Sequence, residues 1–171
     1  MRYVMVILLS LFGIGCMKLP DGVYPVDDFD VNKYLGKWYE IARLDHSFER
    51  GLDNVSAHYT LRDDGGVRVL NRGYSVADKK WKEAEGKAYF IGSRDTGHLK
   101  VSFFGPFYGS YVVFELDKEN YQYAFVTSSK TTYLWFLSRT PTVSKELVQR
   151  FVQKANDLGY NTDNLIFVKH K

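Results

Sequence analysis

The sequence predicts an all-β protein, an eight-stranded antiparallel up-and-down β-barrel with a C-terminal α-helix packed on its wall. Three observations support this fold class. Short β-rich runs alternate with turn residues from residue 37 to residue 138. The connections are short, which is typical of hairpins and not of βαβ crossovers. The long amphipathic segment comes only after the last run, so the runs do not alternate with helices. Such a series is typical of a single meander that closes on itself.

Eight runs rich in aromatic and β-branched residues predict the strands. The turns between them are built from Gly, Asp, Asn, Lys and Ser, residues that tolerate turn conformations. A final short strand is expected over residues 165–168. The eight runs cover residues 37–44, 55–61, 67–74, 81–91, 99–104, 111–116, 121–127 and 132–138.

Two helical segments interrupt the strand pattern. Residues 30–35 predict a short turn with Asp30 as its cap. Residues 144–158 have an apolar stripe at helical spacing and stop at Gly159, the usual C-terminal residue of a helix. The stripe is expected to lie against the barrel wall, and it consists of Leu147, Val148, Phe151, Ala155 and Leu158.

The N-terminus predicts an export signal. Arg2 gives a minimal positive start, and residues 3–12 are apolar over a length too short to span a bilayer. Small residues then lead into Cys16, and this stretch resembles the lipobox of bacterial lipoproteins, although Gly13 stands where that motif usually has Leu. The resemblance implies cleavage before Cys16 and acylation of that cysteine. An ordinary secretory signal with an incidental cysteine is the alternative.

These features predict three regions in the chain. Residues 1–15 form a lipoprotein signal peptide, residues 16–29 an anchor and irregular stalk, and residues 30–171 the barrel domain with its helix. In bacterial lipoproteins, Asp after the acylated cysteine favours the inner membrane. The residue here is Met17, which implies a lipid anchor in the outer membrane of a Gram-negative bacterium, with the barrel facing the periplasm.

Composition excludes several classes of protein. Lys and Arg number 23 against 20 Asp and Glu, and without a long basic run this balance argues against nucleic-acid binding. A single cysteine excludes an intramolecular disulfide and a thiolate zinc site. The histidines lack metal-ligand spacing and are expected to face solvent, so no metal, cofactor or catalytic residue is predicted; they are His46, His58, His98 and His170.

Three short motifs occur in a characteristic order. Gly36-Lys37-Trp38-Tyr39 opens the first strand, Leu116-Asp117 precedes Tyr121, and Ser138-Arg139 ends the eighth strand. Together they resemble the signature regions of the lipocalin family, although the second motif lacks the usual Thr before its Asp. Residues 37–43, 102–109 and 133–135 resemble the bacterial lipocalin lipoproteins more narrowly. The resemblance implies a closed barrel that binds a lipid.

The signature residues also have a physical interpretation. Trp38 should close the narrow end of the barrel, and Arg139 can place its guanidinium over the indole as a cation–π pair worth about 0.5 to 2 kcal/mol. Gly36 lets the backbone enter the strand sharply. We therefore expect Gly36, Trp38 and Arg139 to be structural and not to bind ligand directly.

Alternation along the strands predicts which side chains line the barrel. An eight-stranded barrel either is filled by side chains or holds one small ligand. An apolar lining with tyrosine and asparagine suits a hydrocarbon with a polar head, and the resemblance implies a fatty acid or lysophospholipid carried in envelope maintenance. Residues 81–91 show no clear apolar face. The predicted ligand-binding residues are Ala57, Tyr59, Val69, Asn71, Leu99, Val101, Tyr111, Val113, Tyr133 and Trp135.

Other interpretations stay open at this point. Glu40 shares the face of Trp38, and burial would raise the pKa of its carboxyl; a loop partner or a β-bulge would also explain it. The polar groups in the barrel allow a lipid-modifying enzyme. A barrel filled by its own side chains would instead be a structural envelope protein, with the aromatic loop over residues 103–111 docking a partner or a second copy as a homodimer.

Overall fold

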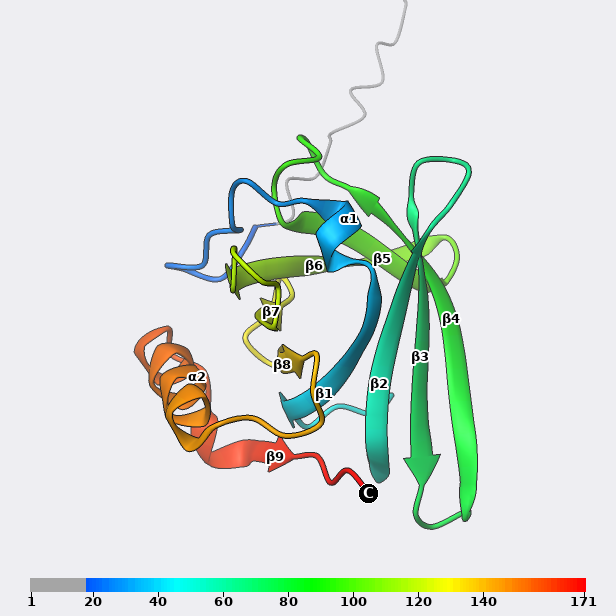
Figure 1. Ribbon diagram of the computed structural model, residues 1–171, viewed down its shortest axis with the longest axis vertical. Helices are drawn as coiled ribbons and strands as arrows, with labels where there is room; N and C mark the ends of the chain where they lie inside the picture. The colour runs from blue at the N-terminus through cyan, green and yellow to red at the C-terminus, as the bar shows by residue number, and fades with distance from the viewer. Residues whose placement is uncertain (1–17) are drawn as a thin grey trace, which may run out of the picture.

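The computed structural model describes residues 18–171, which fold into one antiparallel sheet that closes into a barrel (Figure 1). The strand order is β2-β3-β4-β5-β6-β7-β8-β1-β9, and an additional pairing of β1 with β2 completes the ring. The predicted fold class is confirmed. The barrel strands are β1 (Gly36–Leu44), β2 (Leu52–Leu61), β3 (Val67–Ser75), β4 (Lys80–Phe90), β5 (His98–Phe104), β6 (Phe107–Leu116), β7 (Tyr123–Thr127) and β8 (Leu134–Ser138).

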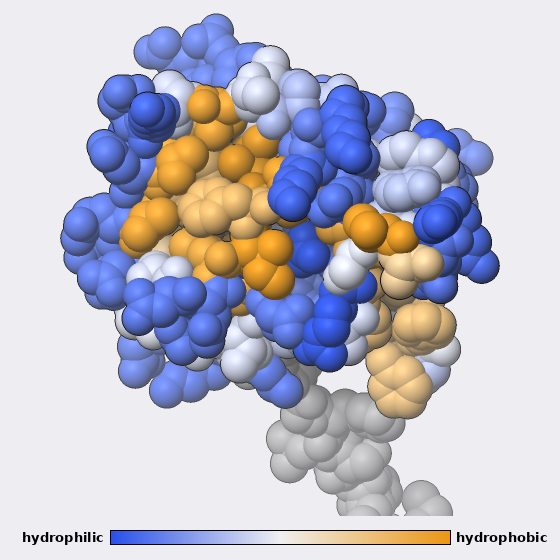
Figure 2. Space-filling model, turned by 90° about the horizontal axis from the view of Figure 1, so that it is seen from below, coloured by the Kyte–Doolittle hydropathy of each residue, from blue (hydrophilic) through white to orange (hydrophobic). Residues whose placement is uncertain are grey.

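The barrel has one closed and one open end. The short helix α1 (Val31–Tyr34) lies across the closed end, at the top of Figure 1, and the Asp30 side chain caps it by accepting a hydrogen bond from Asn32 N. The β1–β2 loop and the β3–β4 hairpin lie at the opposite end. Figure 2 views the molecule from that end, where apolar groups are exposed among charged ones.

A β-bulge in β1 decides which of its side chains enter the barrel. The register against β8 shifts between Glu40 and Ala42, which leaves Ile41 as the extra residue. A bulge reverses the alternation of side chains beyond it. Glu40 and Arg43 therefore both face the interior, although a separation of three residues would place them on opposite faces of a regular strand. Arg43 is paired with Trp135, whose ring packs against the interior cluster.

The helix α2 (Lys145–Asp157) covers the outside of the wall, as predicted (Figure 1). Ser144 caps its first turn, and Gly159 follows its last turn with a φ of +82°. Phe151 and Ala155 are completely buried against the barrel. The cluster under the helix is separate from the one inside the barrel, so α2 stabilises the wall without entering the interior.

The last strand, β9 (Leu165–Phe167), extends the sheet beside β1 after the 3₁₀ turn η1 (Thr162–Asn164). It pairs with residues 42–44 of β1, whereas β2 pairs with residues 36–39. β9 thus occupies the edge of β1 from which β2 has separated. The bulge residue Ile41 also helps to hold the C-terminal segment, because its carbonyl oxygen accepts a hydrogen bond of 2.9 Å from Val168 N.

Strand β4, which the sequence left ambiguous, has two different halves. Residues 80–86 pair with β3 alone, and only residues 87–90 also pair with β5. Ala88 and Phe90 belong to the interior cluster, so this is the inward face. A Cβ on Gly86 would lie 2.8 Å from the Ser102 carbonyl oxygen, which explains a glycine where two strands approach closely.

The segment before α1 packs on the barrel. It is irregular, as expected for residues 18–29, but Phe29 is buried and Val26 exchanges backbone hydrogen bonds of 2.8 Å with Gly97 and Val113. The described part of the expected stalk is therefore held against the barrel. The predicted signal peptide and the proposed anchor residue Cys16 lie outside the described residues.

Four strands begin at least two residues away from their predicted start. β2 begins at Leu52 and β6 at Phe107, each a few residues earlier than predicted, because turn-like sequences continue as paired strand. β7 begins later, because Tyr121 adopts a φ of +53° in the preceding turn, and β8 begins at Leu134. Leu61 alternates with the inward residues Ala57 and Tyr59 and would be expected to face inward with them, but it is 49% exposed at the end of β2.

Candidate functional site

The predicted ligand-binding residues come together inside the barrel. The alternating faces of five strands supply most of them to one apolar cluster, so the sequence pattern located the interior correctly. Asn71 is half-buried and shares their face through its pairing with Ala57. Tyr133 stacks on Trp135 with ring centroids 5.8 Å apart. The members in the cluster are Ala57, Tyr59, Val69, Leu99, Val101, Tyr111, Val113 and Trp135.

Three tyrosines form a hydroxyl chain in the closed half of the interior. The Tyr111 hydroxyl lies 2.7 Å from that of Tyr34 and 2.9 Å from that of Tyr59, so the chain joins α1 to β2 and β6. Burial raises the pKa of all three phenols, which keeps them neutral and able to hydrogen-bond one another. This chain gives a mostly apolar interior one polar element.

The closed end is held by the signature residues. Arg139 places its guanidinium 3.9 Å from the centre of the Trp38 ring and donates hydrogen bonds to the carbonyl oxygens of Lys33, Lys37 and Tyr121. Gly36 has a φ of +94°, where a side chain would be strained. These contacts join α1 to the start of β1 and to the turn between β6 and β7. This is the structural role expected for the three residues.

A buried polar cluster lies in the half of the interior toward the open end. Arg43 Nη1 donates a 2.8 Å hydrogen bond to Glu40 Oε1, and both side chains are almost completely buried. Glu49, from the β1–β2 loop, accepts a 3.2 Å hydrogen bond from Trp135 Nε1 and lies 2.8 Å from His46 Nε2. The five residues Glu40, Arg43, His46, Glu49 and Trp135 are called the polar cluster below.

The two carboxyl groups of the polar cluster titrate differently. Burial raises the pKa of Glu40, and the negative charge of Glu49 raises it further against the opposing effect of Arg43. Burial also acts to raise the pKa of Glu49, but the interactions with His46 and Trp135 outweigh it and leave this pKa lowered. The surroundings therefore favour the protonated form of Glu40 and the ionised form of Glu49.

Sequence reasoning found part of the polar cluster. The interior position of Glu40 and its raised pKa are as expected, and the β-bulge explains how Arg43 joins it. The expectation that all four histidines face solvent is wrong for His46, which is 8% exposed because the β1–β2 loop folds inward. Glu49 was not singled out, since nothing in the spacing of residues shows that a loop carboxylate returns to the barrel.

A groove lies on the outer face of β1, β2, β3 and β4, beside the C-terminal residues. It measures about 470 Å³, has polar and charged walls, and lies on the opposite face of the sheet from the predicted ligand residues. Two of its cations already have aromatic partners, because Arg72 lies 4.2 Å from the centre of the Trp81 ring and Lys37 lies 4.4 Å from that of Tyr39. We therefore place the candidate ligand site inside the barrel.

Within residues 18–171, no three side chains of His, Cys, Asp or Glu are grouped so that they could hold a metal ion. No helix there has the length and apolar character needed to cross a membrane.

The barrel is closed, eight-stranded and antiparallel, it is capped at one end, and apolar and tyrosine side chains line it. Barrels of this class can hold one small ligand. The family model of the lipocalin-like domain matches residues 29–170. The chain belongs to this lipocalin family.

Individual proteins agree with this assignment. The chain is 58% identical to the outer membrane lipoprotein Blc of Vibrio cholerae over the full length of both. It is 52% identical to the protein of that name from Escherichia coli K12, over 88% of this chain and 84% of the other. Insecticyanin from the tobacco hornworm shares the fold, with a TM-score of 0.70 at 23% identity over 90% of this chain and 86% of that one.

Proposed function

We propose that this protein is an outer membrane lipoprotein that holds a fatty acid or lysophospholipid inside its barrel, for storage or transport of lipids in envelope maintenance. The observation that carries the proposal is the single interior cluster to which eight predicted ligand residues contribute. The names of the Vibrio and Escherichia relatives support the location.

The interior suits a single hydrocarbon chain with a polar head. Each methylene transferred from water gains about 0.8 kcal/mol, so a chain of about 14 methylenes supplies a gross gain near 11 kcal/mol before entropy and desolvation are subtracted. This gross gain exceeds the roughly 8 kcal/mol of micromolar binding, which brings such an affinity within reach without an ion pair. Tyrosine hydroxyls at the closed end and the polar cluster toward the open end give the interior its two polar elements.

Ligand binding is tested with delipidated protein. Palmitate and lysophosphatidylcholine should quench tryptophan fluorescence saturably, because Trp135 lies in the interior cluster. Failure of both lipids to bind would overturn the proposal. Incubation with labelled phospholipid serves as the test of the enzymatic alternative, and we expect no product to be released.

Membrane attachment is tested at the N-terminus. We propose that Cys16 carries the acyl chains, since two or more chains anchor a protein stably whereas one does so only marginally. The variant Cys16→Ser should move the protein from the outer membrane fraction to the soluble fraction of the periplasm. Retention in the membrane would contradict the proposed anchor.

Native mass spectrometry of protein extracted from its membrane would measure acylation, bound lipid and the expected homodimer in one experiment.

A further inference from the structure

Three donors of the polar cluster converge on one point toward the open end of the barrel. They are the guanidinium of Arg43, the imidazole of His46 and the indole N–H of Trp135, and we call them the donor corner. Arg43 and Trp135 face each other across the pairing of β1 with β8. The His46 ring packs edge-on against the Trp135 ring at 5.4 Å. Two strands and one loop thus fix three donors for an acceptor.

The acceptor in this structure is a side chain from the loop. Glu49 Oε2 lies 3.2 Å from Trp135 Nε1 and 2.8 Å from His46 Nε2. The Arg43 guanidinium reaches the same residue through the Glu49 carbonyl oxygen, at 2.8 Å. The Glu49 side chain is only 13% exposed, although its neighbours Phe48 and Arg50 are exposed.

Glu49 satisfies the donor corner incompletely. Arg43 Nε and His46 Nδ1 are buried, and neither has a hydrogen-bond partner among the described residues. The approach of His46 Nε2 to the Glu49 carboxylate is close but does not have the angles of a hydrogen bond. Buried polar atoms without partners are costly, by about 1 to 3 kcal/mol each. A larger or better-placed anion would use more of these donors than a single loop carboxylate does.

Charge at the donor corner also favours an anion. Glu40 pairs with Arg43 at 2.8 Å, and burial followed by the negative charge of Glu49 raises the pKa of its carboxyl. The Glu49 carboxylate lies against His46 and Trp135 and its pKa is lowered, so it is the anion that occupies the donor corner. Displacement of Glu49 would leave the N–H groups of the donor corner without this acceptor, which is unfavourable unless another anion takes its place.

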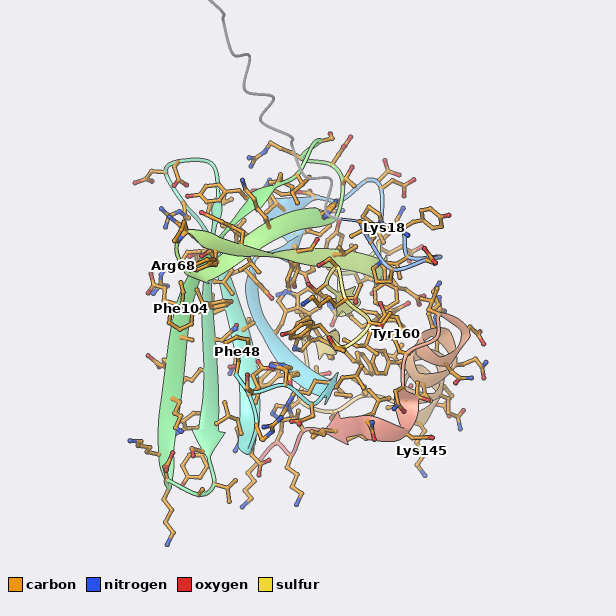
Figure 3. All side chains as sticks on the ribbon, turned by 180° about the vertical axis from the view of Figure 1, so that it is seen from behind. Lys18, Phe48, Arg68, Phe104, Lys145 and Tyr160 are labelled. Atoms are coloured by element: carbon orange, nitrogen blue, oxygen red, sulfur yellow. The ribbon has the colours of Figure 1, made fainter. Side chains whose placement is uncertain are left out.

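The loop that carries Glu49 is held to the barrel through its two inward residues, His46 and Glu49, and through a backbone hydrogen bond from Val76 N to the Gly51 carbonyl oxygen, while its other side chains face solvent. Residues 45–51 connect β1 to β2, and all of them except His46 and Glu49 are exposed. Asp45 and Arg50, both in this loop, form an ion pair with each other at the surface. A loop with little buried apolar area opens at low cost compared with the barrel strands. Figure 3 shows Phe48 projecting from this loop.

We propose that the donor corner binds the anionic head group, carboxylate or phosphate, of the lipid, and that Glu49 occupies it as a tethered competitor until the lipid enters. This inference rests on the proposed function, because it assigns the head-group end of the same ligand. Entry of the lipid head displaces the Glu49 side chain toward solvent, and its hydrocarbon chain extends toward the tyrosines of the closed end.

Laurate and dodecanol test the proposal, because they share a chain length and differ in the charge of the head. Isothermal titration calorimetry on the full chain measures both. Glu49→Gln should tighten laurate binding about tenfold, equivalent to about 1.4 kcal/mol, and leave dodecanol binding unchanged. Trp135→Phe, which removes one donor and keeps a ring, should weaken laurate binding several-fold and spare dodecanol.

Asp45→Asn is the matched control, because it removes the same charge from the same loop but outside the barrel. It should leave both affinities unchanged. Laurate binding to Glu49→Gln that is no tighter than to wild type would overturn the proposal, as would equal shifts for laurate and dodecanol. Binding of acetate or inorganic phosphate alone with comparable affinity would assign the corner to free anions and not to a lipid head.

Two further results separate this inference from the proposed function. If neither laurate nor dodecanol binds the wild type or the variants, the proposed function fails and the inference fails with it. If both bind and their affinities do not depend on Glu49 or Trp135, only the head-group assignment fails. Thermal melting of each variant confirms that it is folded, and the two substitutions test the corner independently of each other.

Discussion

The guanidinium of Arg139 stacks on the indole of Trp38 at 3.9 Å and at the same time donates hydrogen bonds to three backbone carbonyl oxygens. Trp38 is completely buried, and its own Nε1 donates a 2.8 Å hydrogen bond to the Tyr34 carbonyl oxygen. One side chain from the end of β8 therefore joins β1, α1 and the β6–β7 turn. The closed end depends on this pair for its shape.

Arg139→Ala should lower the free energy of unfolding by about 2 to 4 kcal/mol, because it removes a cation–π contact and three hydrogen bonds from a charged donor. Urea unfolding followed by circular dichroism measures this loss. Arg94→Ala is the control: Arg94 also lies over a ring, that of Phe90 at 4.9 Å, but on the surface. We expect a loss below about 1 kcal/mol there, and equal losses would contradict the assigned role.

Tyr111→Phe should destabilise the protein by about 1 to 3 kcal/mol, because it leaves the hydroxyls of Tyr34 and Tyr59 without their shared partner. Urea unfolding again gives the value. Tyr24→Phe removes a hydroxyl from a ring that is 77% exposed and should have no measurable effect. An unchanged stability in Tyr111→Phe would show that the hydroxyl chain does not stabilise the fold.

Glu40 makes stability depend on pH. Its pKa is higher in the folded protein than in the unfolded chain, so the folded state binds more protons and loses stability as the pH rises above the ordinary range of glutamate. Glu49, with a lowered pKa, acts in the opposite sense and loses its contribution as the pH falls through that range. Arg43 donates hydrogen bonds to the Glu40 carboxyl and to the Glu49 backbone carbonyl oxygen.

Glu40→Gln should therefore flatten the decline of melting temperature as the pH rises above the ordinary range of glutamate, since the amide stays neutral throughout. Differential scanning calorimetry at several pH values measures the slope. Glu83→Gln, an exposed glutamate paired with Arg72 on the surface, is the matched control and should keep the wild-type slope. A wild-type slope in Glu40→Gln would exclude the buried carboxyl as its source.

Val101→Trp should block the barrel. Val101 is half-buried and faces the interior cluster, so an indole there takes the volume that a lipid chain needs. Lipid affinity should fall at least tenfold, with an overpacking cost of about 1 to 3 kcal/mol. Lys100→Trp places the same ring on the outer face of β5 and should preserve binding. Equal affinities in the two variants would argue for a ligand site outside the barrel.

The periodicity of the sequence predicted the fold and most of the interior lining. Leu99 and Val101 alternate with polar neighbours, so their side is unambiguous, and a meander with short turns has few alternative topologies. β4 was ambiguous because residues 80–85 are exposed on both faces and carry no apolar alternation. The tertiary position of that strand, and not its own pattern, decides its face.

The polar cluster was harder to predict because it depends on two departures from regular structure. Bulge residue Ile41 turns Arg43 inward, although simple alternation would point it outward. The β1–β2 loop then returns Glu49 and His46 to the barrel, where long-range contact with Trp135 holds them. Neither departure leaves a local signal, because the bulge has no Gly and the loop resembles an ordinary surface turn.

The position of Lys18, the first described residue, bears on how a lipid-anchored protein would face its membrane. Lys18 lies on the closed-end half of the protein (Figure 3). Under the proposed acylation, the capped end stands against the bilayer and the mouth points into the aqueous space. Lipid would then be exchanged with molecules arriving across that space and not taken up directly from the leaflet that holds the anchor.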